Sequence, residues 1–318
     1  MNHLEFRNGD RMPAIGLGTW KSKPTEVENA VTTALENGYR HIDCAKNYAN
    51  EDAVGRAFST VFSSGKIKRK DVWVTSKLWN NSHKRDDVIP ALKSTLKDLQ
   101  LDYLDLFLIH WPVAFKPEIE IFPKEDSDYL SLAEVPLIET LEAMIEAKKL
   151  GLTRHVGVSN FSIKKLKALS RLTDDMPEMN QVEMHPFLTQ DELIEFCTEN
   201  GIHTTAYSPL GSGDRHHSMK KENEPSLINH KTIVEIAQKH NCNPGQVLIK
   251  WAEQRGTAVI PKSTSERHII MNLESANIKL DDADLKAIQN IGTFYRYVDG
   301  EFFVTPGNPY NDIFDLKN

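Results

Sequence analysis

Cysteine and long apolar runs are both scarce in this chain. Its 318 residues include three cysteines, Cys44, Cys197 and Cys242, and no Cys-x-x-Cys pair. This excludes a disulfide-rich scaffold and favours a reducing compartment. No stretch approaches the ~18 apolar residues of a membrane-spanning helix, and residues 1–7 lack a secretory apolar core. We therefore expect a soluble cytoplasmic protein with no membrane partner.

Positive charge is also in short supply. The 38 Lys and Arg residues against 45 Asp and Glu give a formal net charge of −7. The one dense basic run, 66–70, is expected to be a solvated turn, so nucleic acid is not an expected partner. A complete Gly-x-Gly-x-x-Gly fingerprint is missing, because Lys21 stands where a third glycine should follow Gly16 and Gly18. That counts against an open, doubly wound sheet, which stays the alternative fold.

The pattern that is present alternates strand and helix along the whole chain. Apolar, β-rich runs occur at 14–17, 41–44, 72–77, 104–110, 155–159, 180–184, 203–207 and 258–261. Helical periodicity follows them at 25–37, 52–62, 88–99, 137–148, 163–172, 190–200, 231–240 and 266–274. Eight strands, each followed by a helix, predict a (β/α)8 TIM barrel. With no internal repeat or linker, we expect one domain over residues 1–318.

Several segments fall outside the repeating unit. Residues 4–9 and 11–14 could pair as a short N-terminal hairpin that closes the bottom of the barrel. Long loops are expected at 111–134 and 209–229, after strands four and seven, and a tail follows residue 292. The two loops leave the carboxyl ends of their strands, which is the face where barrel enzymes carry chemistry.

Four polar residues converge on that face. Asp43, Lys77 and His110 end strands two, three and four, and Tyr48 follows strand two. Neighbouring strands lie ~4.8 Å apart, so these side chains can meet at one mouth. Singly, each has an ordinary structural explanation, such as a helix cap, a rim cation, a buried histidine or a packing aromatic. Their joint placement at strand ends favours a catalytic site.

The four residue types suit the protonation of a carbonyl oxygen. A free phenol has a pKa of ~10, and a neighbouring ammonium is expected to lower it. Lys77 would supply that charge, Asp43 would keep it protonated and aimed, and His110 would orient the substrate carbonyl. Because no side chain can donate hydride, a nicotinamide cofactor is implied.

The last two strands suggest where a cofactor would lie. The loop 207–213 offers small residues and backbone donors for a pyrophosphate, and the segment 260–268 offers a lysine, hydroxyls and an arginine at a helix start for a further phosphate. An ordinary turn and helix cap remain the alternative for each loop alone. Ser159, Asn160 and Gln181 could hold a carboxamide, and Tyr207 could stack on the nicotinamide or pack in the core.

The chain resembles the aldo-keto reductases from Met12 to about Asp315. Three motifs carry the resemblance: 38–51 around Asp43 and Tyr48, the run 157–161 and the run 260–263. The resemblance implies NADPH across the barrel mouth and Tyr48 as the acid. It also implies cofactor contacts by Thr19, Trp20, Asp43, Ser159, Asn160, Gln181, Tyr207, Ser208, Leu210 and Ser212, a 2′-phosphate grip by Lys262, Ser263 and Thr264, and an adenine contact by Asn272.

Two positions depart from the family's pattern. The arginine expected six residues after Lys262 is His268, with Arg267 just before it, and the usual glutamate before Asn272 is Met271. Arg267 and Lys262 should still select a phosphate. We therefore expect a preference for NADPH, with weaker discrimination against NADH than is usual in the family.

The resemblance also outlines a substrate pocket. Trp20, Trp79 and Trp111 match the family's aromatic wall, for which rim packing is the alternative, and His110 would complete it. Asn47 stands beside Tyr48 where an apolar residue is common, which favours a polar substrate such as an aldose or another hydroxy-aldehyde. The segment 295–303 is expected to form a C-terminal substrate loop, with Asp299 as a further polar candidate.

The leading hypothesis is therefore an NADPH-dependent reductase of aldehydes and ketones. A non-catalytic, cofactor-binding relative is the main alternative, although it would have no need to retain Lys77 and His110. A metal-dependent barrel enzyme is disfavoured, because the scattered His and Glu residues form no ligand set and His216 and His217 lie in a loop. We expect a small carbonyl compound as partner and a monomer, with a dimer as the alternative.

Overall fold

The sheet of the protein is a closed ring of parallel strands. The computed structural model describes residues 2–305, 307–308 and 310–316. Eight parallel strands lie in the order β12-β11-β10-β9-β6-β5-β4-β3. Their bounds are β3 (Leu17–Gly18), β4 (His41–Asp43), β5 (Trp73–Leu78), β6 (Leu104–Ile109), β9 (Thr153–Ser159), β10 (Met179–Glu183), β11 (His203–Tyr207) and β12 (Ala258–Val259).

The two ends of the sheet meet, which makes it a barrel. Ile15 bridges Val259 and Gly18 bridges Lys262, both in parallel, and the Gly16 amide donates to the Val259 carbonyl at 2.9 Å. A side chain at Gly18 would place a Cβ 2.8 Å from the Ile260 carbonyl oxygen, so this seam requires glycine. The (β/α)8 prediction is confirmed, and the open-sheet alternative is wrong. The first and last strands are shorter than expected because their remaining residues pair only through these isolated bridges.

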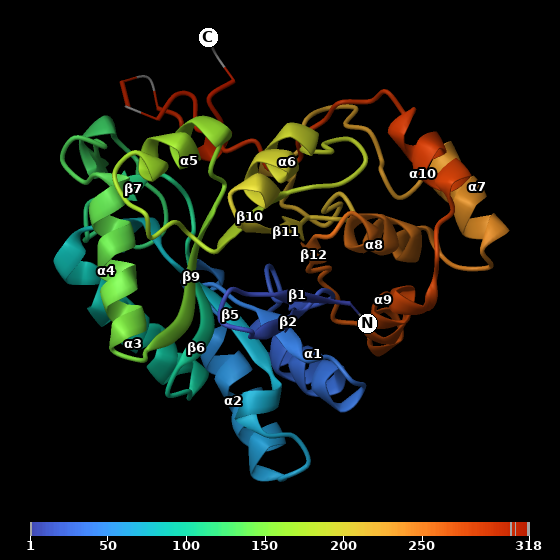
Figure 1. Ribbon diagram of the computed structural model, residues 1–318, viewed down its shortest axis with the longest axis horizontal. Helices are drawn as coiled ribbons and strands as arrows, with labels where there is room; N and C mark the ends of the chain where they lie inside the picture. The colour runs from blue at the N-terminus through green and yellow to red at the C-terminus, as the bar shows by residue number, and fades with distance from the viewer. Residues whose placement is uncertain (1, 306, 309, 317–318) are drawn as a thin grey trace.

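Helices surround the strands, as Figure 1 shows. Their bounds are α1 (Pro24–Glu36), α2 (Glu51–Ser63), α3 (Arg85–Leu99), α4 (Leu137–Lys149), α5 (Ile163–Ser170), α6 (Asp191–Glu199), α7 (Lys231–Lys239), α8 (Pro244–Gln254), α9 (Glu266–Glu274) and α10 (Asp282–Gln289). All eight expected helices are present within a few residues. Gly38 and Gly151 follow α1 and α4 with φ of 101° and 75°, values that explain why glycine ends these helices.

The sequence analysis does not predict helices α8 and α10. Helix α8 packs on β12 and takes the barrel position expected for residues 231–240. The helix at those residues, α7, packs instead on α8 and α10 at the outer edge (Figure 1). Both missed helices carry start signals, since the Asn243 side chain accepts from the Gln246 amide at 2.9 Å and Asp281 accepts from Asp284 at 2.9 Å.

The N-terminal hairpin closes the bottom of the barrel, as predicted. Strands β1 (His3–Glu5) and β2 (Arg11–Pro13) pair antiparallel, with Leu4 opposite Met12. The hairpin side chains Leu4, Phe6 and Met12 form a buried cluster with barrel residues Trp73, Leu106, Leu108, Met179 and Ala258. This apolar plug seals the amino ends of the strands and leaves the carboxyl ends open.

The long segments gather over the other end of the barrel. The segment after β6, expected to be a long loop, contains a small sheet of β7 (Ala114–Phe115) and β8 (Tyr129–Leu130). The C-terminal tail lies against it, because the Tyr310 hydroxyl donates to the Leu130 carbonyl at 2.6 Å and the Tyr129 hydroxyl donates to Phe303 at 2.6 Å. Short 3-10 turns complete the chain: η1 (Lys46–Tyr48), η2 (Arg69–Asp71), η3 (Asn80–Ser82), η4 (Asp126–Asp128), η5 (His217–Met219), η6 (Ser275–Asn277) and η7 (Glu301–Phe303).

Candidate active site

Asp43, Lys77 and Tyr48 form one hydrogen-bonded chain at the carboxyl ends of the strands. Asp43 ends β4, Lys77 lies near the end of β5, and Tyr48 lies in the turn η1. The Lys77 ammonium donates to Asp43 Oδ1 at 2.5 Å, to the Cys44 carbonyl at 2.8 Å and to Tyr48 Oη at 3.2 Å. The ammonium thus reaches the aspartate and the phenol at the same time.

The Lys77–Asp43 pair is enclosed on every side. The Lys77 side chain is 0% exposed and that of Asp43 is 1% exposed. The second carboxylate oxygen, Oδ2, accepts from the Gln181 amide at 2.7 Å. Burial by itself would lower the pKa of Lys77, but Asp43 and Tyr48 outweigh it and raise that pKa above its usual value. Lys77 is therefore a permanent cation.

The phenol is less acidic than the sequence argument expected. Burial raises the pKa of Tyr48 to about 12, and Lys77 opposes this without overcoming it. Lys77 lowers the pKa as expected, but the loss of hydration outweighs it, so the net pKa lies above the usual value. A phenol of this pKa is still far more acidic than water, whose pKa is ~15.7, and so it can protonate an alkoxide.

His110 joins the group as an uncharged ring. It follows β6 and is 7% exposed, and its ring lies 5.8 Å from that of Tyr48 in an edge-on contact. Burial, with the neighbouring charge of Lys77, holds the pKa of His110 well below its usual range. A neutral imidazole can donate a hydrogen bond to a substrate oxygen but gives up no proton at neutral pH. The four predicted residues therefore come together as predicted.

A cavity of about 730 Å³ opens above these residues. Nearly all the residues predicted to contact a cofactor line it: Thr19, Trp20, Asp43, Ser159, Asn160, Gln181, Tyr207, Ser208, Leu210, Ser212, Lys262, Ser263, Thr264 and His268. The residues predicted for a substrate line it too: Trp20, Asn47, Trp79, His110 and Trp111. Arg267 is exposed and Asn272 is buried, and neither is part of this lining. Contact of these two residues with a nucleotide stays a prediction.

The middle of the cavity floor is a polar network. The Ser159 hydroxyl donates to the Gln181 carbonyl at 2.8 Å, and the Asn160 amide donates to the His110 carbonyl at 3.0 Å. The Tyr207 hydroxyl donates to Asn160 Oδ1 at 2.7 Å. Asn160 has a left-handed φ of 65°, which asparagine tolerates better than most residues. These contacts preorganise an amide-rich surface beside Tyr48 and His110, suited to a carboxamide.

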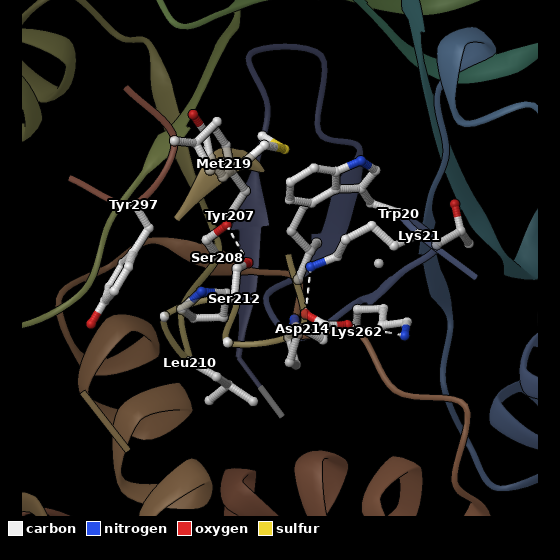
Figure 2. A pocket seen from close by; sticks show the side chains of 18 of the residues that line it. Trp20, Lys21, Tyr207, Ser208, Leu210, Ser212, Asp214, Met219, Lys262 and Tyr297 are labelled. Carbon is white, nitrogen blue, oxygen red and sulfur yellow. Dashed lines mark hydrogen bonds and ion pairs between the residues drawn. The ribbon is translucent and has the colours of Figure 1, made fainter. Parts of the chain in front are cut away.

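One end of the cavity is bridged by charges that sequence reasoning missed. Asp214, in the loop after β11 (residues 208–230), accepts from Lys21 at 2.5 Å and from Lys262 at 3.3 Å (Figure 2). The bridge links segments that leave β3, β11 and β12. No local motif marks Lys21 or Asp214, because they are 193 positions apart and meet only when the barrel closes. Two lysines with nearby hydroxyls can bind a polyphosphate, so this end suits an anionic nucleotide.

The other end of the cavity is mainly aromatic. Beyond the predicted tryptophans, Phe122, Tyr297, Val298 and Phe302 line it. Three residues of the segment 295–303 thus line the cavity, and its role in substrate binding stays a prediction, whereas Asp299 is not part of the lining and pairs instead with Lys221 at 2.9 Å. Phe122 could not be predicted, because no sequence feature shows which residue of the loop after β6 turns toward the cavity.

Residues 2–305, 307–308 and 310–316 offer neither a candidate metal site nor a candidate membrane-spanning helix. They contain no group of three or more His, Cys, Asp or Glu side chains arranged to hold a metal ion. None of their helices is long and apolar enough to cross a membrane.

Comparison with known proteins gives consistent matches. Residues 14–293 match the model of the aldo/keto reductase family. An aldo/keto reductase of Synechocystis is 46% identical over 98% of this chain and 94% of its own length. Aldo-keto reductase family 1 member A1 of Gallus gallus is 42% identical over 92% of this chain and 89% of its own length. An aldose reductase structure from Schistosoma japonicum superposes with a TM-score of 0.88 at 34% identity, covering 98% of this chain and 99% of its own.

Proposed function

This chain belongs to the aldo/keto reductase family, and we propose that it is an NADPH-dependent reductase of aldehydes and ketones with Tyr48 as the proton donor. The family is one of oxidoreductases that act on small carbonyl compounds with nicotinamide cofactors. The observation that carries the proposal is the Lys77 ammonium, which lies within hydrogen-bonding distance of both Asp43 and Tyr48 beneath the cavity.

The residues divide the chemistry among them. A substrate carbonyl lies between Tyr48 and His110, where the neutral imidazole orients the oxygen by a hydrogen bond. A nicotinamide held by these residues would supply the hydride for the carbonyl carbon. As negative charge develops on the oxygen, Tyr48 transfers its hydroxyl proton to that oxygen, and Lys77 stabilises the resulting phenolate. The same arrangement run backward oxidises an alcohol.

The donor set of the cavity fits a phosphorylated dinucleotide. Ser159, Asn160 and Gln181 would hold the nicotinamide carboxamide, and Ser208 and Ser212 the pyrophosphate. Lys262, Ser263 and Thr264 would hold the 2′-phosphate, with Arg267 and His268 nearby and Asn272 toward the adenine. Lys262 is already within 3.3 Å of a carboxylate oxygen, which supports its ability to pair with an anion there.

The substrate proposed is a polar aldehyde, such as an aldose or another hydroxy-aldehyde. Asn47 supports this, because it lines an otherwise aromatic wall beside Tyr48 and its Oδ1 has no hydrogen-bond partner among the described residues. We further propose that residues 1–318 act as one cytoplasmic, monomeric reductase domain.

A spectrophotometric assay tests the proposal. With glyceraldehyde as substrate, NADPH absorbance should fall with enzyme-dependent kinetics, and kcat/KM should be higher with NADPH than with NADH. Lys262→Met should reduce this preference by about tenfold, since it removes a charge-assisted contact to the phosphate. Consumption of neither cofactor with any aldose, aromatic aldehyde or ketone would favour a non-catalytic relative. A strong preference for NADH would refute the cofactor assignment.

A further inference from the structure

A carboxylate outside the catalytic group has an unusual set of partners. Glu183, the last residue of β10, has a fully buried side chain. Its Oε1 accepts from the Tyr297 amide at 2.6 Å and from His185 Nε2 at 2.8 Å, and its Oε2 accepts from the Val298 amide at 2.7 Å. A carboxylate only accepts hydrogen bonds, so the two amides and the imidazole each find an acceptor here, and all three bonds are charge-assisted.

The backbone that Glu183 holds is part of the cavity wall. Tyr297 and Val298 both line the cavity, and they belong to a stretch without helix or strand between α10 and η7. A stretch of this kind has no ladder of its own to fix it. Beyond the two bonds to Glu183, the Tyr295 amide donates to the Phe187 carbonyl at 2.9 Å. The side chains of Tyr297 and Val298 pack into the core, and the backbone of this wall is hydrogen-bonded to the barrel mainly through one carboxylate.

The same attachment reaches the loop after β11. The Tyr297 hydroxyl donates to the Pro225 carbonyl at 2.8 Å, and its ring lies so near Gly211 that a Cβ there would come within 3.1 Å. In the view of Figure 2, Tyr297 lies across the cavity from Lys21 and Lys262. That loop keeps its own anchor through Asp214, which pairs with both lysines. Loss of the Glu183 contacts should therefore loosen the substrate wall more than the nucleotide end.

We propose that Glu183 is a positioning residue that sets the substrate specificity of the cavity by holding the Tyr297–Val298 backbone, without touching substrate or cofactor itself. The inference rests on the proposed function for its specificity readout. The hydrogen bonds themselves can be tested without any assay of activity. His185 packs against Tyr297 with ring centroids 5.0 Å apart, so it orients the carboxylate and supports the same wall.

The test compares Glu183→Gln with a matched control, Glu178→Gln. Glutamine can accept one of the two amides, but its own NH2 group then faces the other donor. Glu178 directly precedes β10 and also pairs with a histidine, His155 at 2.7 Å, at the closed end of the barrel. Glu183→Gln should raise the KM for aldehydes about tenfold and change the ratio of kcat/KM between a bulky aromatic aldehyde and glyceraldehyde. The Kd for NADPH should stay within about twofold of wild type. Glu178→Gln should leave the KM and this ratio unchanged.

Amide hydrogen exchange provides the measurement that does not depend on turnover. In the wild-type protein the amides of Tyr297 and Val298 should exchange as slowly as those of β10, and in Glu183→Gln about tenfold faster or more, with the barrel strands unchanged. Fast exchange of these two amides in wild type overturns the proposal, even if the variant fails to fold. An unchanged KM and substrate ratio in a folded Glu183→Gln also overturns it. Absence of any carbonyl turnover by wild type refutes the proposed function instead, and slow wild-type exchange would still establish the attachment.

Discussion

The two ends of the barrel differ in how well their buried polar groups are supplied with hydrogen-bond partners. At the closed end, His155 is fully buried and both ring nitrogens contact carboxylates, Glu178 at 2.7 Å and Asp10 at 3.0 Å. Both carboxylates also pair with a cation, since Lys148 lies 2.5 Å from Glu178 and Arg154 lies 2.6 Å from Asp10. These contacts fasten the hairpin turn to the strands.

The open end instead contains many buried polar atoms without a partner. Among the described residues, such atoms include Glu51 Oε2, His110 Nδ1 and the polar side-chain atoms of Asn80 and His83. The rest also follow the carboxyl ends of strands, except Arg69 Nε, which precedes β5, and Arg296 Nε and Nη1, which follow helix α10. An unsatisfied buried group costs ~1–3 kcal/mol. The closed end is thus arranged for stability, while the open end gives up stability at the site of the chemistry.

Replacing Lys77 should produce the largest effect at the open end. Lys77→Met removes the cation beneath Tyr48, and kcat/KM should fall at least about 10³-fold, the scale of a lost general-acid system. Lys250→Met is the matched control, because Lys250 is also buried and pairs with a carboxylate, Glu253, at 2.6 Å. That control should lose stability but keep its turnover. Equal losses of activity in two folded variants would contradict the assignment.

At the closed end the largest effect should be on stability. His155→Gln leaves two half-buried carboxylates with poorer partners, so the free energy of unfolding should fall by about 2 kcal/mol. Urea denaturation measures this, and kcat/KM should stay within about twofold of wild type. His203→Gln serves as control, since His203 also packs on Phe6 (ring centroids 4.8 Å apart) but donates only to a backbone carbonyl. A His155 variant as stable as wild type would remove the contrast between the two ends.

The loss of stability caused by burying Glu51 at the open end should make the free energy of unfolding depend on pH. Burial raises the pKa of Glu51 to about 7, against the hydrogen bond from Ser76 at 2.5 Å. Because the folded pKa is above the unfolded one, the unfolding free energy should fall as pH rises from about 4.5 to about 7. Glu51→Gln should then be more stable than wild type by about 2 kcal/mol at pH 8 and nearly equal at pH 4.5.

Thermal and urea unfolding across this pH range measure the Glu51 effect. Glu36→Gln, at the exposed end of α1, is the control and should leave the pH profile unchanged. A Glu51 variant that is less stable than wild type at pH 8 would show that the carboxylate is favourably held after all.

The smallest expected effect concerns the substrate wall. Asn47→Val removes an amide from the mainly aromatic substrate wall, so the KM for aldoses should rise about threefold more than that for aromatic aldehydes. Asn81→Val is the control, because Asn81 lies in the turn η3 after β5, outside the cavity lining. Equal changes for both substrate types would rule out a specific role for Asn47.

Most of the fold could be predicted because its signals are local and repeated. The alternation of β-rich and helical segments identified all eight barrel strands, and Asp43, Lys77 and His110 were found since each stands at the end of its strand. The error at α8 arose where a long loop and an extra helix interrupted the repeat. The Asn243-Pro244 pair is a helix start signal, but the alternation of one strand with one helix leaves no place for a further helix there.

What could not be predicted depends on contacts between distant residues. Lys21 meets Asp214, and Glu183 meets Tyr297 and Val298, only after the barrel has closed and the tail has folded over it. The pKa of Tyr48 was misjudged for a related reason. The sequence shows that a lysine is near, but the degree of burial that opposes it follows from the packed structure.

The account depends most directly on Tyr48 as the source of the proton. Tyr48→Phe removes one oxygen and leaves the cavity lining otherwise intact. Aldehyde reduction should fall at least about 10³-fold, while the Kd for NADPH, measured by fluorescence titration, should stay within about twofold of wild type. Turnover within about tenfold of wild type would contradict the assignment.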